Sequence, residues 1–188
     1  RIKSLQLQAQ TEEMLKGTAE LSFKDADTGG SSPSPSYTAE NPLVYHTGTF
    51  TVDASSVPIT AFSVSIASGL LDARKQIGSA LVQQQQTGQY AVTGELTAYF
   101  EDLTLVNKFL NGTPAAIVLD LTGTAIGTTT RRIKIEIPTA FFNGETPKLS
   151  GVDGEVMLKL PFESVKTGGG SPDELIKVTL NNSRSSAY

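Results

Sequence analysis

The stretch QYAVTGELTAYFEDLTLVNKFLNGTPAAIVLDLTG, residues 89–123, contains both residue patterns that decide the fold. Apolar and polar residues alternate over Gln89 to Phe100, which predicts a strand with one buried and one solvent-exposed face. The spacing of apolar residues becomes helical over Glu101 to Pro114. An apolar strand is predicted again over Ala115 to Gly123. The stretch therefore predicts a strand, one short helix and a second strand.

The predicted helix has its own start and stop signals. Asp102 is the expected N-cap, because its carboxylate can accept from the first free backbone N–H groups. Asn111 and Gly112 supply the left-handed stop, and Pro114 follows them. The apolar residues at helical spacing are Leu103, Val106, Phe109 and Leu110. We therefore expect one short amphipathic helix in a chain of strands.

Alternation with a period of two residues recurs in the rest of the chain. Further strands are expected over residues 4–11, 18–25, 48–54, 59–70, 131–138, 151–165 and 175–182. The first two form a predicted hairpin, with Gly17 at its bulge or turn. About eight to ten strands with regular turn signals indicate a mainly antiparallel β-sandwich or β-barrel.

The length of 188 residues corresponds to about one domain. We expect a single domain over residues 1–188, with a flexible Gly-, Ser- and Pro-rich loop at 26–41. The chain begins with Arg1 rather than Met, so we expect it to be the C-terminal part of a longer protein.

Candidate chemistry is sparse. The chain has no Cys and a single histidine, His46, which argues against a zinc site. Residues 25–30 resemble part of a calcium loop but lack its distal Glu, and residues 167–174 lack the Lys of a phosphate-binding loop. We therefore predict no catalytic residue, no metal and no cofactor, and a protein that is not an enzyme.

The formal net charge is −4 and the pI is about 5.0. This balance argues against tight, non-specific binding of nucleic acid, which requires clustered Lys and Arg to neutralise phosphates. The acidic charge is compatible with a surface along which nucleic acid moves without binding.

Two polar segments are candidates for contacts between subunits. The first is a row of amides that can hydrogen-bond to a neighbour, and the second is a loop that can order against one. Both segments can equally be solvated surface loops. The candidate residues are Gln83, Gln84, Gln85, Gln86, Ser32, Pro33, Ser34 and Pro35.

The order of motifs between about Pro42 and Asn182 resembles that of the tail tube (major tail) proteins of long-tailed bacteriophages. The segments that carry the resemblance are Phe62 to Leu70, Ile77-Gly78, Val92 to Asp102, Leu103 to Thr113, Ala115 to Leu121, Ile133 to Pro138 and Lys177 to Asn182. Individual motifs are degenerate, and their order and spacing carry the specificity. The Ser- and Pro-rich loop at 29–36 has no counterpart in the pattern.

The resemblance implies a tail-tube-like β-sandwich whose subunits form rings, typically sixfold, that stack into a hollow tube. It further implies tape-measure, terminator and baseplate proteins as partners, a place in the virion tail, and assembly in the bacterial host cytoplasm. DNA would pass through the bore without specific binding, and no membrane would be involved. Acidic residues facing the bore would repel phosphates within about 8 Å at physiological salt.

Glu95 and Glu136 lie on polar strand faces and are the candidates for the lumen, although each can equally lie on an outer, solvated face. Arg132 and Lys134 share the face of Glu136, which weakens that candidate. Two other functions stay open: a β-sandwich adhesin or carbohydrate-binding module, and the inner tube of a contractile injection system. The low content of aromatic residues disfavours a sugar-binding platform.

Overall fold

The computed structural model of the chain describes residues 1–23, 29, 41–71, 77–78, 86–143, 149–152, 155–166 and 174–182. The strands are β1 (Ile2–Gln10), β2 (Lys16–Leu21), β3 (Gly48–Val52), β4 (Ser55–Ser56), β5 (Ile59–Ala67), β6 (Leu70–Leu71), β7 (Gln86–Thr87), β8 (Ala91–Tyr99), β9 (Ala115–Ile126), β10 (Thr129–Phe142), β11 (Leu149–Val152), β12 (Glu155–Ser164) and β13 (Lys177–Asn181). The helices of this described part are the short 3-10 helix η1 (Tyr45–Thr47) and α1 (Thr104–Asn111). The predicted all-β class with a single α-helix is confirmed.

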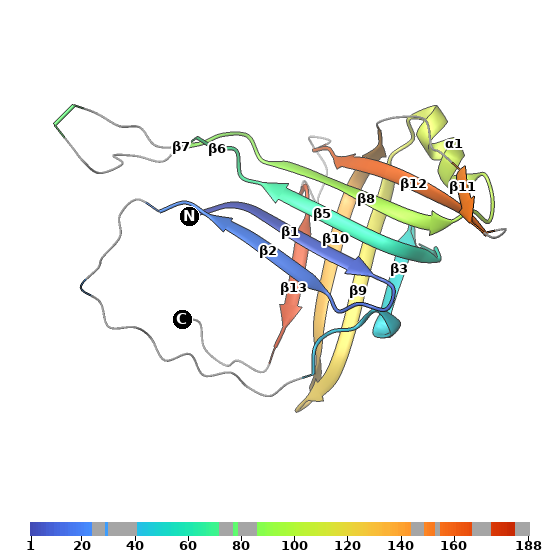
Figure 1. Cartoon of the computed structure of the whole chain (residues 1–188), viewed down its shortest axis with the longest axis horizontal. Coiled ribbons are helices and arrows are strands. Elements are labelled where there is room, and N and C mark those ends of the chain that lie inside the picture. Colours follow the sequence, from blue (N-terminus) through green and yellow to red (C-terminus); the bar gives the residue numbers. More distant parts are fainter. Residues whose placement is uncertain are drawn as a thin grey trace.

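All the described strands except β6 and β7 belong to one antiparallel sheet that folds back on itself. We call the first half layer one: it has the order β2-β1-β5-β8-β12, with β11 beside β12. Layer two has the order β10-β9-β3-β4, with β13 beside β10. The layers are joined where residues 140–142 of β10 pair with residues 162–164 of β12. Figure 1 shows the strands of layer one crossing over those of layer two, which is a β-sandwich joined at one corner.

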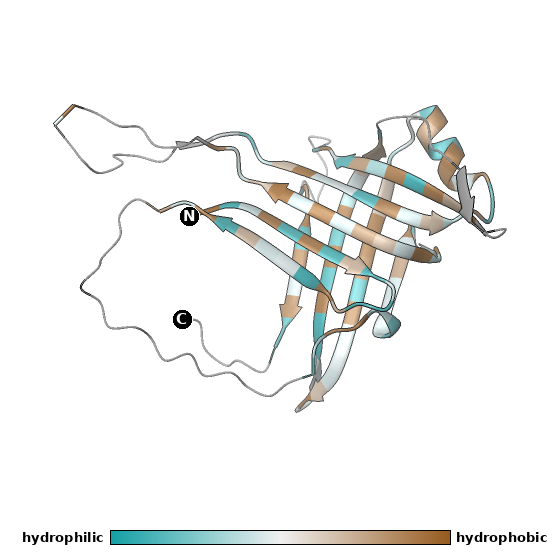
Figure 2. Ribbon diagram, in the orientation of Figure 1, coloured by the Kyte–Doolittle hydropathy of each residue, from teal (hydrophilic) through white to brown (hydrophobic). Residues whose placement is uncertain are grey.

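The core lies between the layers and takes every second residue of the long strands. On β8 the buried side chains are Val92, Leu96 and Ala98, each exposed by 1% or less. On β9 and β10 they include Ile117, Ile135 and Ile137, which are equally buried. Figure 2 shows the resulting alternation of apolar and polar bands along the strands. Because side chains on a strand alternate between its faces, this pattern fixes which face of each layer turns inward.

Gly94 occupies an inward position of β8 without a side chain. A Cβ atom there would lie 2.3 Å from Phe162 Cζ and 2.4 Å from the carbonyl oxygen of Ser63. The ring of Phe162 instead stacks on that of Phe62, with centroids 5.9 Å apart, and Phe62 contacts Phe50 of layer two at 5.4 Å. The absent side chain therefore makes room for aromatic packing that connects the layers.

Helix α1 ends at the predicted signal and begins one residue later than predicted. Asp102 Oδ1 accepts a hydrogen bond from the Thr104 N–H at 2.7 Å. This hydrogen bond holds the pKa of Asp102 below its ordinary value. At the other end Gly112 has a φ of 59°, and its N–H donates to the carbonyls of Lys108 and Phe109. The cap residue by backbone geometry is Leu103, one position after Asp102, so Asp102 caps from just outside the helix.

The predicted first hairpin is confirmed, but the position of its turn was wrong. β1 pairs with β2 in antiparallel register, and the connection spans residues 11–15. Gly17 lies inside β2 opposite Leu7, whose Cδ2 would be 3.3 Å from an added Cβ. The glycine therefore accommodates the side chain of Leu7 and does not make the turn.

The predicted single strand over residues 151–165 was also wrong. The segment holds two strands: β11 pairs with β12, and Val152 lies opposite Glu155. The predicted eight to ten strands fall short of the thirteen in the described residues, partly because β4, β6 and β7 have two residues each.

Candidate assembly surfaces

The outer side of layer one is broad, polar and low in charge. Two rows of neighbouring residues cross it, and they consist of Gln8, Ser63, Glu95 and Pro161 in one row and Gln6, Ser65, Thr93 and Glu163 in the next. We call this surface the layer-one face. Its described charged residues are Lys16, Glu20, Glu95, Lys159 and Glu163, and Glu13 and Lys3 reach it through ion pairs with Lys16 and Glu20, so four acids stand against three lysines. Glu95 forms an ion pair with Lys159 at 3.1 Å, and both side chains stay substantially exposed.

The outer side of layer two, which we call the layer-two face, has a denser pattern of charges. Arg132 forms a bidentate ion pair with Asp120. Its Nε donates to Oδ1 at 2.7 Å, and its Nη2 donates to Oδ2. The Asp120 carboxylate raises the pKa of Arg132 through this contact. Lys134 Nζ donates to Glu136 Oε1 at 2.6 Å, and Lys177 lies opposite Glu136 on β13. Three cations thus face two acids, a balance opposite to that of the layer-one face.

The two predicted lumen residues lie on different surfaces. Glu95 belongs to the layer-one face and Glu136 to the layer-two face, on opposite outer sides of the same core. Each carboxylate is paired with a lysine. A bore lined by one side of the sandwich, as the resemblance implies, would be faced by only one of the two glutamates.

Both layers end in strands whose outer edge has no partner among the described residues. All six residues of β2 are exposed, and β2 pairs only with β1. On β13, Val178 and Leu180 are 42% and 61% exposed, although their neighbours on β10 lie in the core. An open strand edge invites pairing with another chain. These two borders are therefore open to pairing with another chain.

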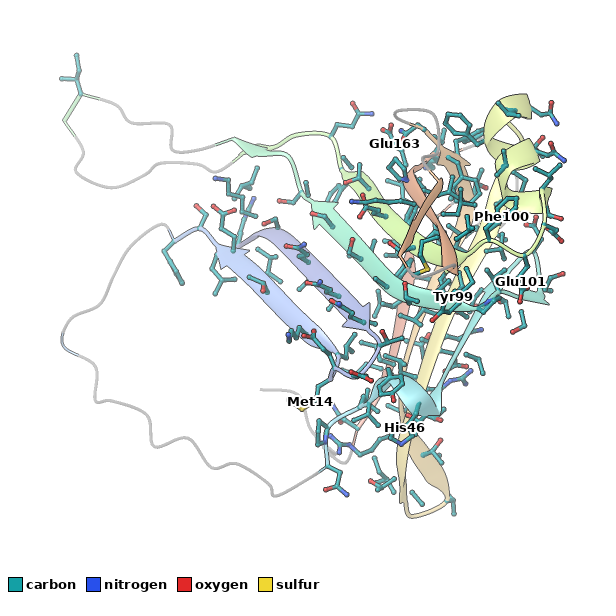
Figure 3. All side chains as sticks on the ribbon, turned by 45° about the vertical axis from the view of Figure 1, so that its right-hand side comes forward. Met14, His46, Tyr99, Phe100, Glu101 and Glu163 are labelled. Atoms are coloured by element: carbon teal, nitrogen blue, oxygen red, sulfur yellow. The ribbon has the colours of Figure 1, made fainter. Side chains whose placement is uncertain are left out.

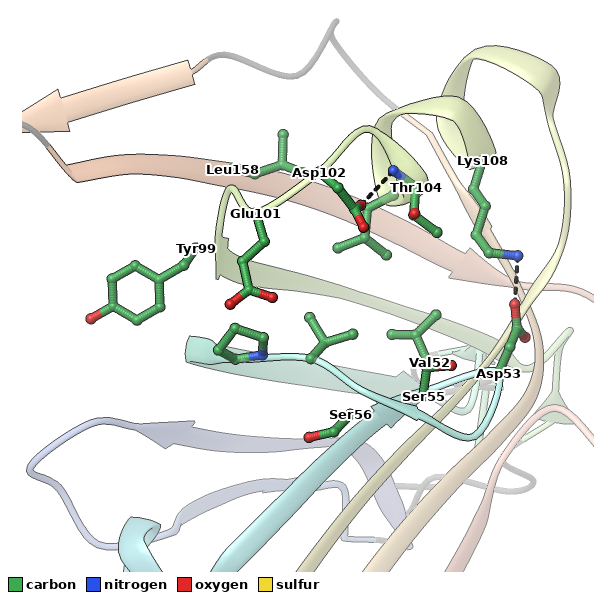
Figure 4. A pocket seen from close by; sticks show the side chains of 13 residues that line it. Val52, Asp53, Ser55, Ser56, Tyr99, Glu101, Asp102, Thr104, Lys108 and Leu158 are labelled. Carbon is green, nitrogen blue, oxygen red and sulfur yellow. Dashed lines mark hydrogen bonds and ion pairs between the residues drawn. The ribbon is translucent and has the colours of Figure 1, made fainter.

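A cleft of about 250 Å³ lies beneath α1, between the helix and the turn that joins β3 to β4 (Figure 4). Asp53 and Ala54 at this turn have φ values of 50° and 64°, a left-handed conformation that residues other than glycine rarely adopt. Asp53 Oδ2 contacts Lys108 Nζ at 2.5 Å, and Oδ1 accepts from the Ala116 N–H at 2.7 Å (Figure 4). One carboxylate therefore ties the turn to the helix and to β9.

The pKa of Asp53 reflects two opposed effects. Partial burial acts to raise it, but hydrogen bonds from Lys108 and Ala116 outweigh that effect, so the pKa lies below its ordinary value. Figure 3 places Tyr99 and Glu101 at the same end as α1, whereas His46 lies away from it, in η1. Among the described residues, no group of three His, Cys, Asp or Glu side chains is arranged to hold a metal ion.

Comparison with protein families matches residues 1–164 to the family described as phage tail tube protein. The match covers most of the chain and includes both layers of the sandwich up to the end of β12. This chain belongs to the phage tail tube protein family. No curated protein matches it.

Membership confirms the resemblance seen in the order of motifs. The chain is a structural protein of the virion tail, in a family that is structural rather than enzymatic. In the part of this tail tube protein that the structure describes, no helix is long and apolar enough to cross a membrane.

Most of the predicted contact residues of this tail tube protein lie outside the described residues. They are Ser32, Pro33, Ser34, Pro35, Gln83, Gln84 and Gln85, and the predicted flexible loop at 26–41 is likewise outside except for Gly29 and Asn41. Gln86 is described as part of β7, where it pairs with Leu71.

Sequence reasoning missed the base of the segment that carries these glutamines. There the Gly88 N–H donates to the Gly69 carbonyl at 2.8 Å. A Cβ on Gly69 would lie 2.4 Å from the carbonyl oxygen of Gln89. The two glycines were a signal in the sequence for this close backbone approach.

Proposed function

We propose that this tail tube protein closes into rings, sixfold as in the tail tubes that it resembles, and that the rings stack into a hollow tube. DNA passes through the tube during ejection without specific binding. Tape-measure, terminator and baseplate proteins are the proposed partners, and assembly takes place in the bacterial host cytoplasm. The amide row Gln83 to Gln86 and the loop residues Ser32 to Pro35 remain proposed contacts between subunits.

The observation that carries ring formation is the border of layer one at β2. One edge of its backbone has no partner among the described residues, and its side chains are exposed along the whole strand. Leu21, at its end, is 51% exposed. Lys16 and Glu20, the charges that would otherwise discourage pairing, are already engaged with Glu13 and Lys3. A second copy that pairs along β2 continues the sheet, and a head-to-tail contact of this kind closes into a ring when its rotation closes.

The charge balance of the two faces supports layer one as the wall of the bore. The layer-two face carries an excess of cations, which would attract the phosphates of passing DNA. The layer-one face carries small hydroxyl and amide side chains and a slight excess of acids. We therefore assign Glu95 to the lumen and Glu136 to the outside of the tube.

Because the chain has no cysteine, single cysteines can report which face lines the bore. Thr93 and Thr49 are both exposed threonines on strands, the first on the layer-one face and the second on the layer-two face. In assembled tubes, Thr93→Cys should react with a small maleimide but not with a bulky polyethylene-glycol maleimide. Thr49→Cys should react with both reagents.

Electron microscopy of the purified full chain tests the assembly itself, and hollow tubes or stacked rings are expected. A protein that stays monomeric at high concentration and binds glycans would contradict the proposed function. Tubes in which Thr49→Cys is the protected position would instead reverse only the assignment of the faces.

A further inference from the structure

An open hollow of about 930 Å³ lies at the end of the sandwich where β8 begins and β12 ends. Its apolar lining consists of Ile66, Tyr90, Val92, Val165, Leu175 and Ile176. Tyr90 is 55% exposed and Val165 is 40% exposed, so the apolar wall is accessible from outside. Glu163, Lys166 and Glu174 stand beside it and give the hollow charges of both signs.

Helix α1 lies at the other end of the same strand, after β8 ends (Figure 1). Its inward side packs on the core through Leu105, which is buried, and through Val106 and Phe109. Leu103 and Leu110 are 57% and 65% exposed on the outside. Leu103 is the N-cap residue and Leu110 lies in the last turn, so both lie next to Val106, at the edge of the side that packs on the core. The helix end therefore carries an apolar strip, Leu103 and Leu110, that lies outside the core cluster of the described residues.

The hollow and the leucine strip cannot meet within one copy. β8 has nine residues, which separates the two features by about 30 Å at about 3.4 Å per residue. A second copy displaced along the direction of β8 brings its helix end to the hollow of the first. The contact uses two different surfaces, so it leaves a free helix end and a free hollow at the ends of any stack and can repeat without limit.

We propose that α1 of each subunit seats Leu103 and Leu110 in the hollow of a subunit in the adjacent ring. This inference rests on the proposed tail tube assembly, and it assigns the stacking contact to these two surfaces. The helix end and the wall of the hollow are both apolar, and Lys166 beside the hollow is opposite in charge to Glu101 and Asp102 at the start of the helix. Contact between rings is thereby separate from contact within a ring, which uses the strand borders.

Disulfide cross-linking tests the contact, since the natural chain has no cysteine. The double variant Leu110→Cys/Val165→Cys, assembled into tubes and mildly oxidised, should give a ladder of covalent oligomers on a non-reducing gel. Mixing the two single variants should give a covalent dimer and nothing larger. The matched control is Thr49→Cys/Val165→Cys, because Thr49 is also exposed but lies on the layer-two face and on neither β2 nor β13, and it should give no ladder.

The experiment distinguishes failure of the stacking contact from failure of the proposed tube assembly. Tubes that form normally while the 110–165 pair gives no cross-link overturn this inference and leave the proposed function standing. A chain that forms neither rings nor tubes overturns both. The variant Leu110→Asp should yield rings that do not elongate into tubes, and Leu110→Asp tubes as long as those of the natural chain would also overturn the inference.

Discussion

At the scale of single residues, the packing between the layers leaves no room for a side chain at Gly94. In Gly94→Ala the added methyl group meets the Phe162 ring and the backbone of Ser63 at distances well below van der Waals contact. We expect a loss of about 1–3 kcal/mol in the free energy of unfolding, the usual cost of overpacking a core. Urea denaturation of the monomer measures it. Thr93→Ala, on the exposed side of the same strand, should change the free energy by no more than about 0.5 kcal/mol, and equal stabilities of the two variants would contradict the packing argument.

Asp53 connects three elements through one carboxylate, and its charge should make that connection depend on pH. Its pKa is lowered in the folded protein, so the ionised form contributes stability above the ordinary value of about 3.9. That contribution is lost as the pH falls through the lower, folded value. The natural chain should therefore be more stable than Asp53→Asn at pH 7, and the difference should shrink below about pH 4. Thermal unfolding from pH 7 down to pH 2 measures it, and a difference that stays constant would show that the carboxylate charge has no part in it.

At the scale of elements, α1 has one side that holds it on the sandwich and another that does not. Leu105 is 8% exposed and belongs to the core, whereas Leu110 is 65% exposed. Leu105→Ala should lower the free energy of unfolding by about 2–4 kcal/mol, because it leaves a cavity under the helix. Leu110→Ala should leave the monomer unchanged within about 0.5 kcal/mol. Denaturation curves of the two variants compare the two sides directly, and a comparable loss in Leu110→Ala would mean that the exposed strip serves the fold.

The elements that were predicted correctly are those whose signals are local. β5, β8 and β10 alternate over most of their length, and the residues that cap α1 lie within two positions of its ends. The two errors have local causes as well. Gly17 has the same residue type whether it makes a turn or makes room for Leu7, and the alternation of residues 151–165 continues through the Asp153-Gly154 connection. Only the pairing of strands separates these alternatives.

At the scale of the whole molecule, sequence patterns identified polar strand faces but not the surface to which each belongs. Glu95 and Glu136 have the same alternating context, yet they lie on opposite outer sides of the sandwich. The cause is the corner where three residues of β10 pair with three of β12 and turn one sheet into two layers. These pairs join segments about twenty residues apart, and no local pattern encodes them. The open hollow and the free borders also depend on that corner. The assembly surfaces could therefore not be predicted from local sequence patterns either.

The dimensions of the subunit set the spacing of the proposed rings. β8 spans about 30 Å, and a helix seated at its end adds about 10 Å, the diameter of a helix with its side chains. Strands in a barrel tilt by about 35–45° from its axis, which shortens the strand contribution. If α1 of each subunit seats in the hollow of the next, the axial repeat of the tube should be about 30–40 Å. The power spectrum of electron micrographs of straight tubes measures this repeat. A value near 60 Å would place the hollow beyond the reach of the helix in the next ring, and the contact between rings would then have to be made by other residues.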